Sequence, residues 1–127
     1  MATFALTMLV SKDLERSRDF YRDVLGLTVG EDHPPHWVDF QLDGGVLLGI
    51  HPENAASNLT VVPGSISNGF TVDDVDGFIA HIKTRGVSVI SEPRDESFGR
   101  LAIIADPDGY AVQVYTPAAR SWAAARD

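Results

Sequence analysis

The chain has 127 residues, no cysteine and a formal net charge of −8, from 10 Lys and Arg against 18 Asp and Glu. This length fits one compact domain with its own core, and the lack of cysteine excludes disulfides, a thiolate zinc site and a cysteine nucleophile. The acidic balance argues against a nucleic-acid partner and leaves room for a cationic one. No apolar run is long enough to cross a membrane and the N-terminus lacks a basic leader, so a cytoplasmic protein is expected.

The chain repeats one pattern of elements. Asp13 and Asp74 are expected to cap two helices that Gly26 and Gly86 end. Strands are expected at residues 5–10, 27–30, 37–42 and 46–51, then again at residues 68–72, 87–92, 99–105 and 110–115. The order βαβββ therefore occurs twice. This pattern predicts a first module at about 1–52, a linker at 53–65, a second module at about 66–116 and a tail at 117–127.

Three segments, residues 10–27, 70–76 and 106–115, carry motifs whose order and spacing resemble one known superfamily. It is the vicinal oxygen chelate superfamily of glyoxalases, extradiol dioxygenases, and fosfomycin and bleomycin resistance proteins. The resemblance implies an α+β fold, in which the mixed sheets of two βαβββ modules form a concave cup for the ligand within a single domain. It also implies a two-fold homodimer.

Hairpin register predicts which side chains line this cup. If the Asp43-Gly44-Gly45 turn pairs Leu42 with Val46, one face of the first hairpin is mixed and the other is apolar, and the apolar face should pack on the helix. The mixed face holds Trp37, Asp39, Gln41, Leu47, Gly49 and His51. The first strand of each module adds Leu6, Met8 and Ser67.

The second hairpin turns at Asp106-Pro107-Asp108-Gly109, a strong turn signal. Pairing Ala105 with Tyr110 would bring two sets of alternating residues onto one face. These are Arg100, Ala102 and Ile104 on one strand, and Ala111, Gln113 and Tyr115 on the other.

The resemblance implies a divalent metal at four positions, which align with Leu6, Gly49, Ser67 and Gln113. Leu and Gly cannot ligate, Ser is a poor neutral ligand, and one Gln holds no metal alone, so no metal or other cofactor is expected. Among the histidines, His33 and His36 flank two prolines that forbid helical spacing, and His81 is expected on the surface of its helix.

The remaining cup residues each have a structural and a functional interpretation. His51 is either a rim histidine beside Trp37 or a proton-transfer group. Asp39 is either a solvated carboxylate or, as favoured here, an anchor for the ligand. Arg100 either contributes to the ligand site or has a structural role by pairing with Asp39 or a neighbouring acid. Trp37 and Tyr115 are either core aromatics or, as favoured here, a stacking surface. Trp122 could be a lid, a dimer contact or part of a loose tail.

Three functions compete on this basis. The favoured one is a metal-free protein of the bleomycin-resistance type that binds an aromatic, cationic, antibiotic-like small molecule. The second is a metal-independent enzyme that uses His51 or Asp39 as a general base on a small carbonyl or polyketide-like substrate. The third is a metal-dependent lyase or dioxygenase. Neither a membrane nor a nucleic acid is expected as a partner.

Overall fold

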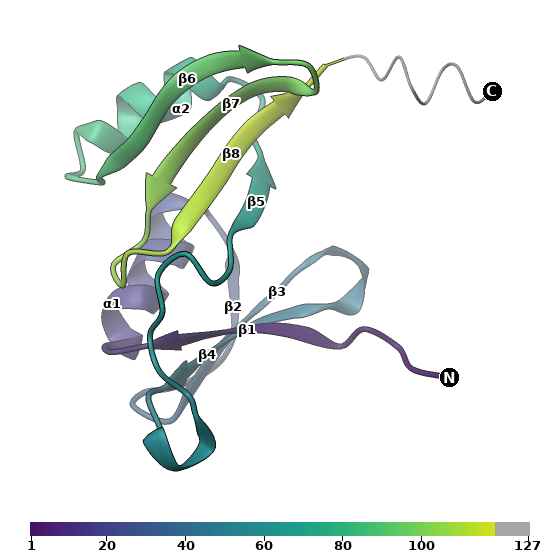
Figure 1. The fold of residues 1–127 in the computed structure, drawn as a ribbon, viewed down its shortest axis with the longest axis vertical. Helices are drawn as coiled ribbons and strands as arrows, with labels where there is room; N and C mark the ends of the chain where they lie inside the picture. The colour runs from purple at the N-terminus through teal and green to yellow at the C-terminus, as the bar shows by residue number, and fades with distance from the viewer. Residues whose placement is uncertain (119–127) are drawn as a thin grey trace. The chain divides into compact units, whose positions relative to one another are not determined.

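The structure is a computed structural model that describes residues 1–118. The chain divides into two compact units, Met1–Val62 and the part that begins at Pro63, and each contains a four-stranded sheet (Figure 1). The division falls inside the predicted linker at 53–65. No helix within residues 1–118 is long and apolar enough to span a membrane. The predicted tail with Trp122 lies outside the described residues except for Pro117 and Ala118.

The first unit has the order βαβββ. It consists of β1 (Leu6–Ser11), α1 (Leu14–Asp19), the π-helical turn η1 (Phe20–Val24), β2 (Thr28–His33), β3 (Trp37–Gln41) and β4 (Leu47–Pro52). The sheet order is β1-β4-β3-β2, with β1 parallel to β4 and the other pairs antiparallel. Short 3-10 turns follow β3 at η2 (Asp43–Gly45) and β4 at η3 (Ala55–Ser57).

The second unit repeats this connectivity. It consists of β5 (Asn68–Thr71), α2 (Val75–Lys83), β6 (Val89–Glu96), β7 (Gly99–Ala105) and β8 (Ala111–Pro117). The sheet order is β5-β8-β7-β6, with β5 parallel to β8. The predicted α+β fold of two βαβββ modules is confirmed. The cup between the two sheets stays a prediction.

Both helices begin where the sequence predicts. The Asp13 carboxylate accepts a hydrogen bond from Arg16 N at 3.1 Å, and the Asp74 carboxylate accepts one from Gly77 N at 3.1 Å. These bonds satisfy backbone donors that a helix start leaves unpaired. The π-helical turn η1, which continues α1, has no capping residue of this kind to indicate it in the sequence.

Each helix covers one face of its own sheet. In the first unit this face consists of the fully buried residues Val38, Phe40, Leu48 and Ile50. The ring of Tyr21, on η1, packs 5.9 Å from that of Phe40. In the second unit, α2 contributes the buried Val75, Ile79 and Ile82 toward β7 and β8. The opposite face of each sheet therefore remains open within its own unit.

The register of the first hairpin is confirmed. Leu42 N donates to Val46 O at 2.9 Å, and β3 pairs with β4 so that Gln41 lies opposite Leu47 and Asp39 opposite Gly49. The parallel pairing of β1 with β4 also places Leu6 beside Leu47 and Met8 beside Gly49, on the same open face.

The predicted register of the second hairpin is wrong by one residue. Ala105 pairs with Ala111, so Tyr110 belongs to the turn. The cause is the buried Asp106 carboxylate, which accepts hydrogen bonds from Asp108 N at 2.9 Å and Tyr110 N at 3.0 Å. These bonds hold Tyr110 inside the loop, as local side-chain acceptors do in turns.

This shift reverses the faces of β7, because successive strand residues point to opposite sides. The residues that share the open face with Gln113 and Tyr115 are Leu101, Ile103 and Ala105. Arg100, Ala102 and Ile104 lie on the helix-covered face, where Ala102 and Ile104 are fully buried. These three residues are therefore not on the face predicted for them.

Candidate functional site

An aromatic surface lies on the open face of the first sheet. The six-membered ring of Trp37 lies over Gly49, so closely that a Cβ added to Gly49 would overlap the ring. Trp37 is half-buried, and its ring centroid lies 6.4 Å from that of His51 at an edge-to-face angle of 71°. We call Trp37, Asp39, Gly49 and His51 the Trp37 platform. The predicted contact of Trp37 with His51 is confirmed.

Asp39 holds the indole in this position. Its Oδ2 accepts a hydrogen bond from Trp37 Nε1 at 2.8 Å, and its Oδ1 accepts one from Glu31 N at 2.8 Å. The residue is only 5% exposed. A buried carboxylate needs such donors, since burial without them is costly. Asp39 is therefore committed to the protein on both oxygens, which argues against its predicted role as a direct anchor for the ligand.

A glycine makes room for this carboxylate. A Cβ on Gly30 would overlap Asp39 Oδ1. Gly30 lies where the pairing of β2 with β3 shifts register, between Val29 and Asp32. Such a bulge re-aims backbone groups, and here it allows Glu31 N to point at Asp39. Sequence reasoning missed Gly30, because the contact joins residues on two strands across an irregular register.

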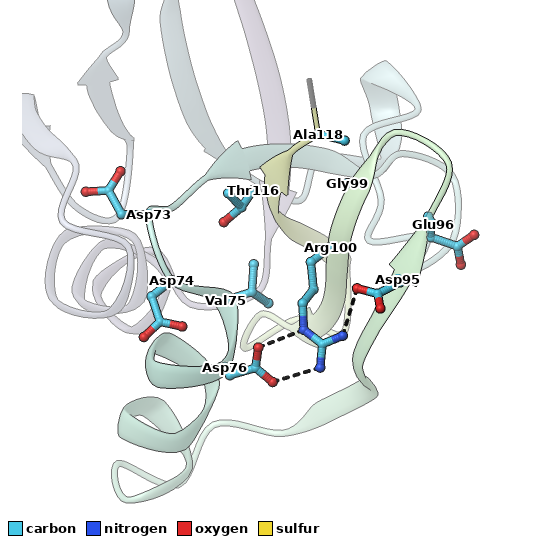
Figure 2. A pocket seen from close by; sticks show the side chains of 10 residues that line it. All are labelled: Asp73, Asp74, Val75, Asp76, Asp95, Glu96, Gly99, Arg100, Thr116 and Ala118. Atoms are coloured by element: carbon cyan, nitrogen blue, oxygen red, sulfur yellow. Dashed lines mark hydrogen bonds and ion pairs between the residues drawn. The ribbon is translucent and has the colours of Figure 1, made fainter. Parts of the chain in front are cut away.

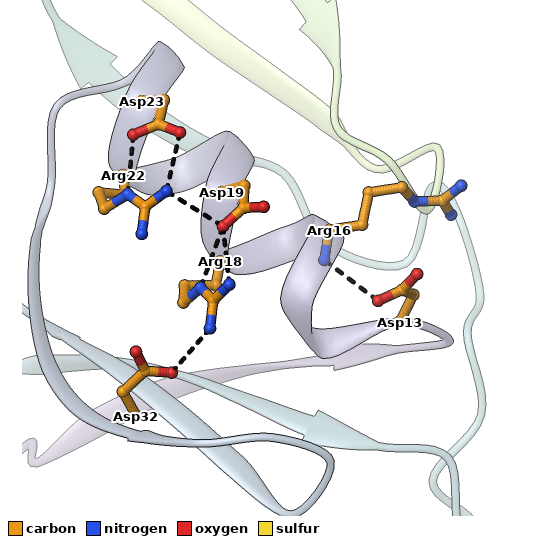
Figure 3. A network of polar contacts seen from close by, with 7 residues as sticks. All are labelled: Asp13, Arg16, Arg18, Asp19, Arg22, Asp23 and Asp32. Carbon is orange, nitrogen blue, oxygen red and sulfur yellow. Dashed lines mark hydrogen bonds and ion pairs between the residues drawn. The ribbon is translucent and has the colours of Figure 1, made fainter.

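The bulged segment is connected to the helix by a network of ion pairs (Figure 3). Arg18 donates to Asp32 at 3.2 Å and also bonds Asp19, while Arg22 bonds Asp19 and Asp23. The hydrogen bonds to Asp32 and Asp19 raise the pKa of Arg18 above its ordinary value. The network thus joins α1 and η1 to the strand that supports Asp39.

His51 has a defined hydrogen bond. Its Nδ1 lies 2.6 Å from Pro52 O, and a carbonyl oxygen can only accept, so Nδ1 carries the proton. This leaves Nε2 as the ring nitrogen that can take up a proton. His33 lies in an exposed pair with Glu31, and His36 and His81 are exposed, as predicted.

The open face of the second sheet is less polar. Ser67 Oγ donates to Ala111 O at 2.8 Å, and Gln113 Nε2 donates to Ser67 Oγ at 3.3 Å. Gly69 lies beside Gln113, and Tyr115 packs edge-to-face on Phe98 with ring centroids 6.2 Å apart. Of the predicted residues, this face brings together Ser67, Ala111, Gln113 and Tyr115. It also includes Leu101 and Ile103, which the wrong register excluded.

Arg100 belongs to a different pocket, at the N-terminal end of α2 (Figure 2). This pocket of about 380 Å³ lies on the helix side of the second sheet, and five of its ten lining residues are acidic. Arg100 donates to both oxygens of Asp76, at 2.7 and 2.9 Å, and to Asp95 at 3.0 Å. The structural alternative is therefore correct. The partners of Arg100 are the neighbouring acids Asp76 and Asp95, and not Asp39.

The Asp76–Arg100 pair makes stability depend on pH in a defined direction. The hydrogen bonds from Arg100 lower the pKa of Asp76 below its ordinary 3.8. A lowered pKa stabilises the fold above the ordinary value, and this contribution disappears as the pH falls through the folded-state value. Arg100→Ala should therefore lower the unfolding midpoint slightly at pH 7, since the pair is exposed. The difference in melting temperature between Arg100→Ala and the wild type should disappear well below pH 3.8.

Asp76→Asn is the control for this prediction, because it should reproduce the small gap at pH 7. A gap between Arg100→Ala and the wild type that persists in strong acid would show that Arg100 acts through its packing and not through its charge.

The residues at the four expected ligand positions do not fit a divalent metal. Leu6 and Gly49 offer no donor atom, and the Trp37 ring covers Gly49. Ser67 and Gln113 are bonded to each other, and both are neutral. Among residues 1–118, no group of three or more His, Cys, Asp or Glu is arranged to hold a metal ion. Divalent metals in proteins are usually held by imidazole nitrogens and carboxylate oxygens, and the side chains at these four positions provide neither.

Comparisons with known proteins agree with this fold. The family model described as "Glyoxalase/Bleomycin resistance protein/Dioxygenase superfamily" matches residues 3–114. A probable lactoylglutathione lyase from Synechocystis sp. is 31% identical over 85% of the chain and 90% of the relative. The anthracycline biosynthesis protein DnrV from Streptomyces peucetius is 30% identical over 84% of the chain, which spans only 44% of that relative.

A solved structure adds an antibiotic-binding relative. The chain resembles TnmS3, an antibiotic binding protein from Streptomyces sp. CB03234, with a TM-score of 0.75 and 28% identity. The match covers 93% of this chain and 98% of TnmS3. The relatives thus include both binding proteins and enzymes.

Proposed function

Because the chain belongs to the glyoxalase/bleomycin resistance protein/dioxygenase superfamily, we propose that it binds an aromatic, cationic, antibiotic-like small molecule without a metal. The observation that carries this proposal is the Trp37 ring over Gly49, which puts an aromatic surface where the resembled family would place a metal ligand. Large, half-exposed aromatic rings provide contact area for planar ligands. The likeness to TnmS3 supports a binding function of this kind.

The residues proposed to contact the ligand lie on the open face of each unit, taken separately. In the first unit they are Leu6, Met8, Trp37, Gln41, Leu47, Gly49 and His51, and in the second they are Ser67, Ala111, Gln113 and Tyr115. A two-fold homodimer remains part of the proposal, since β1, β2, β5 and β6 are edge strands that a second copy could cover. A monomeric mass by light scattering would contradict the dimer.

The test combines metal analysis with a thermal-shift screen. Planar aromatic natural products, anthraquinones among them, are added to purified protein with and without a chelator. A ligand of the folded state should raise the melting temperature by the same amount in both conditions. About one equivalent of Zn, Ni, Fe or Mn that is lost in Gln113→Ala would contradict the proposal, because it would show a working metal site.

A metal-independent enzyme is the second candidate. It is favoured by the His51 geometry, in which Nε2 can take up a proton beside the aromatic ring. The relative named as a lactoylglutathione lyase supports chemistry of this general kind. Turnover of a bound compound that His51→Gln abolishes, without loss of binding, would favour the enzyme over the binding protein.

A further inference from the structure

The Asp39 carboxylate is a charged group next to the aromatic ring that is poorly placed to contact a ligand directly. It is the buried negative charge of the Trp37 platform, yet both of its oxygens already accept hydrogen bonds from the protein. Because Asp39 is also only 5% exposed, a cationic ligand has little carboxylate surface to contact there. Any influence of this charge on the ligand must pass through the groups that Asp39 bonds or through space.

We propose that Asp39 is a positioning residue that selects planar aromatic cations through the face of the Trp37 indole. This inference rests on the proposed function and names how the same surface recognises its ligand. Asp39 fixes the ring through Nε1, and the absence of side chains at Gly49 and Gly30 lets the ring and the carboxylate occupy these positions.

The hydrogen bond also changes the chemistry of the ring. An indole N–H that donates to an anion loses positive character to that anion, so electron density rises over the ring face. Cations are attracted to the face of Trp more than to those of other aromatic residues, and the attraction increases when water is excluded. A fixed, electron-rich indole therefore prefers a cationic ring to a neutral ring of the same shape.

His51 lies beside the same indole ring. Its ring meets the indole edge-to-face, and its Nδ1 proton is committed to Pro52 O. When neutral, this histidine adds no positive charge that would oppose a cation beside Trp37. The face of the indole, and not a side-chain carboxylate, then makes the main contribution to recognising the positive charge of the ligand.

Two probes of nearly equal shape test the proposal. N-methylacridinium carries a permanent charge, and acridine is neutral at pH 8. Both are titrated into a Trp122→Phe background, so that Trp37 is the remaining tryptophan. We expect N-methylacridinium to bind about three- to thirty-fold more tightly than acridine, which is the range of cation–π energies expressed as a ratio.

Fluorinated tryptophans separate the ring from the carboxylate. Replacing Trp37 with tryptophans that carry increasing numbers of fluorine atoms lowers the electron density of the ring and leaves Asp39 unchanged. The preference for N-methylacridinium should fall stepwise toward one, while acridine binding falls less. A preference that stays constant across the series would overturn the proposal and assign the effect to the charge of Asp39 acting through space.

Two variants complete the experiment. Trp37→Phe keeps the Asp39 charge but lacks the N–H, and it should lose most of the preference. Asp39→Asn should shift the Nε1–H resonance of Trp37 upfield in NMR spectra and reduce the preference. If Asp39→Asn fails to fold, the fluorotryptophan series still decides. Equal binding of both probes by the Trp122→Phe protein would reject this inference alone, whereas no binding of either would also reject the proposed function.

Discussion

Gly49→Ala is expected to lower the free energy of unfolding by about 1–3 kcal/mol, the usual range for an overpacked site. A Cβ at this position would overlap the six-membered ring of Trp37, which the bond to Asp39 holds in place. The ring must then move or the strand must shift. Chemical denaturation measures the loss, and tryptophan fluorescence reports the displaced ring.

Gly69→Ala is the matched control, because Gly69 is also a strand glycine on an open face. A Cβ there would lie 3.5 Å from Tyr115 and 3.8 Å from Gln113, which is ordinary contact. The expected change is less than about 0.5 kcal/mol.

The double variant Gly49→Ala/Trp37→Ala tests the cause of the loss. In a Trp37→Ala background the added methyl group meets no ring, so the cost of Gly49→Ala should largely disappear. An equal cost in both backgrounds would show that the strand itself, and not the indole, requires glycine at position 49.

The first hairpin could be predicted from the sequence because two signals agreed. The Asp43-Gly44-Gly45 turn fixed the pairing, and the alternate positions Val38, Phe40, Leu48 and Ile50 are uniformly apolar. Only one register buries that set against the helix. The position of Trp37 beside His51 followed from the same register.

The second hairpin could not be predicted in the same way, because both faces of β7 are apolar. Leu101 and Ile103 alternate with Ala102 and Ile104, so burial does not distinguish the two registers. The choice depended on whether Tyr110 lies in the strand or in the turn. The Asp106 carboxylate decides this through a hydrogen bond to Tyr110 N, which turn composition alone does not reveal.

The hydrogen-bond partners of Asp39 also could not be predicted from the sequence. Its partners are an indole two residues away and a backbone N–H on a neighbouring strand, presented by an irregular register. Sequence reasoning correctly placed Asp39 on the open face and expected a partner for its charge. It assigned that partner to the ligand, whereas the protein supplies it.

The last prediction concerns the long-range field of the chain. The association rate of N-methylacridinium should fall about ten-fold or more as salt rises from about 0.01 M to about 1 M, because the screening length shrinks from about 30 Å to about 3 Å. Dissociation should change less, since contact with the indole face acts at short range. Stopped-flow fluorescence measures both rates.

The structure shows which acids of the first unit can supply this field. Asp39 is buried, and Asp32 is paired with Arg18. Glu31 is 68% exposed and pairs with His33, and Glu53 accepts a backbone hydrogen bond from Val61 N at 3.0 Å. These two glutamates are exposed near the end of the sheet where Trp37 and His51 lie, so they can attract a cation toward that end.

The variant Glu31→Gln/Glu53→Gln should therefore flatten the dependence of the association rate on salt. Asp43→Asn is the matched control, since it removes a negative charge at the opposite, turn end of the β3–β4 hairpin and should have a smaller effect. Association rates that do not depend on ionic strength, or tight binding of the anionic acridine-9-carboxylate, would show that the net charge of −8 serves solubility. Either result would also weaken the binding proposal relative to a metal-independent enzyme that uses His51, because such an enzyme needs a base beside its substrate and not a field that attracts cations.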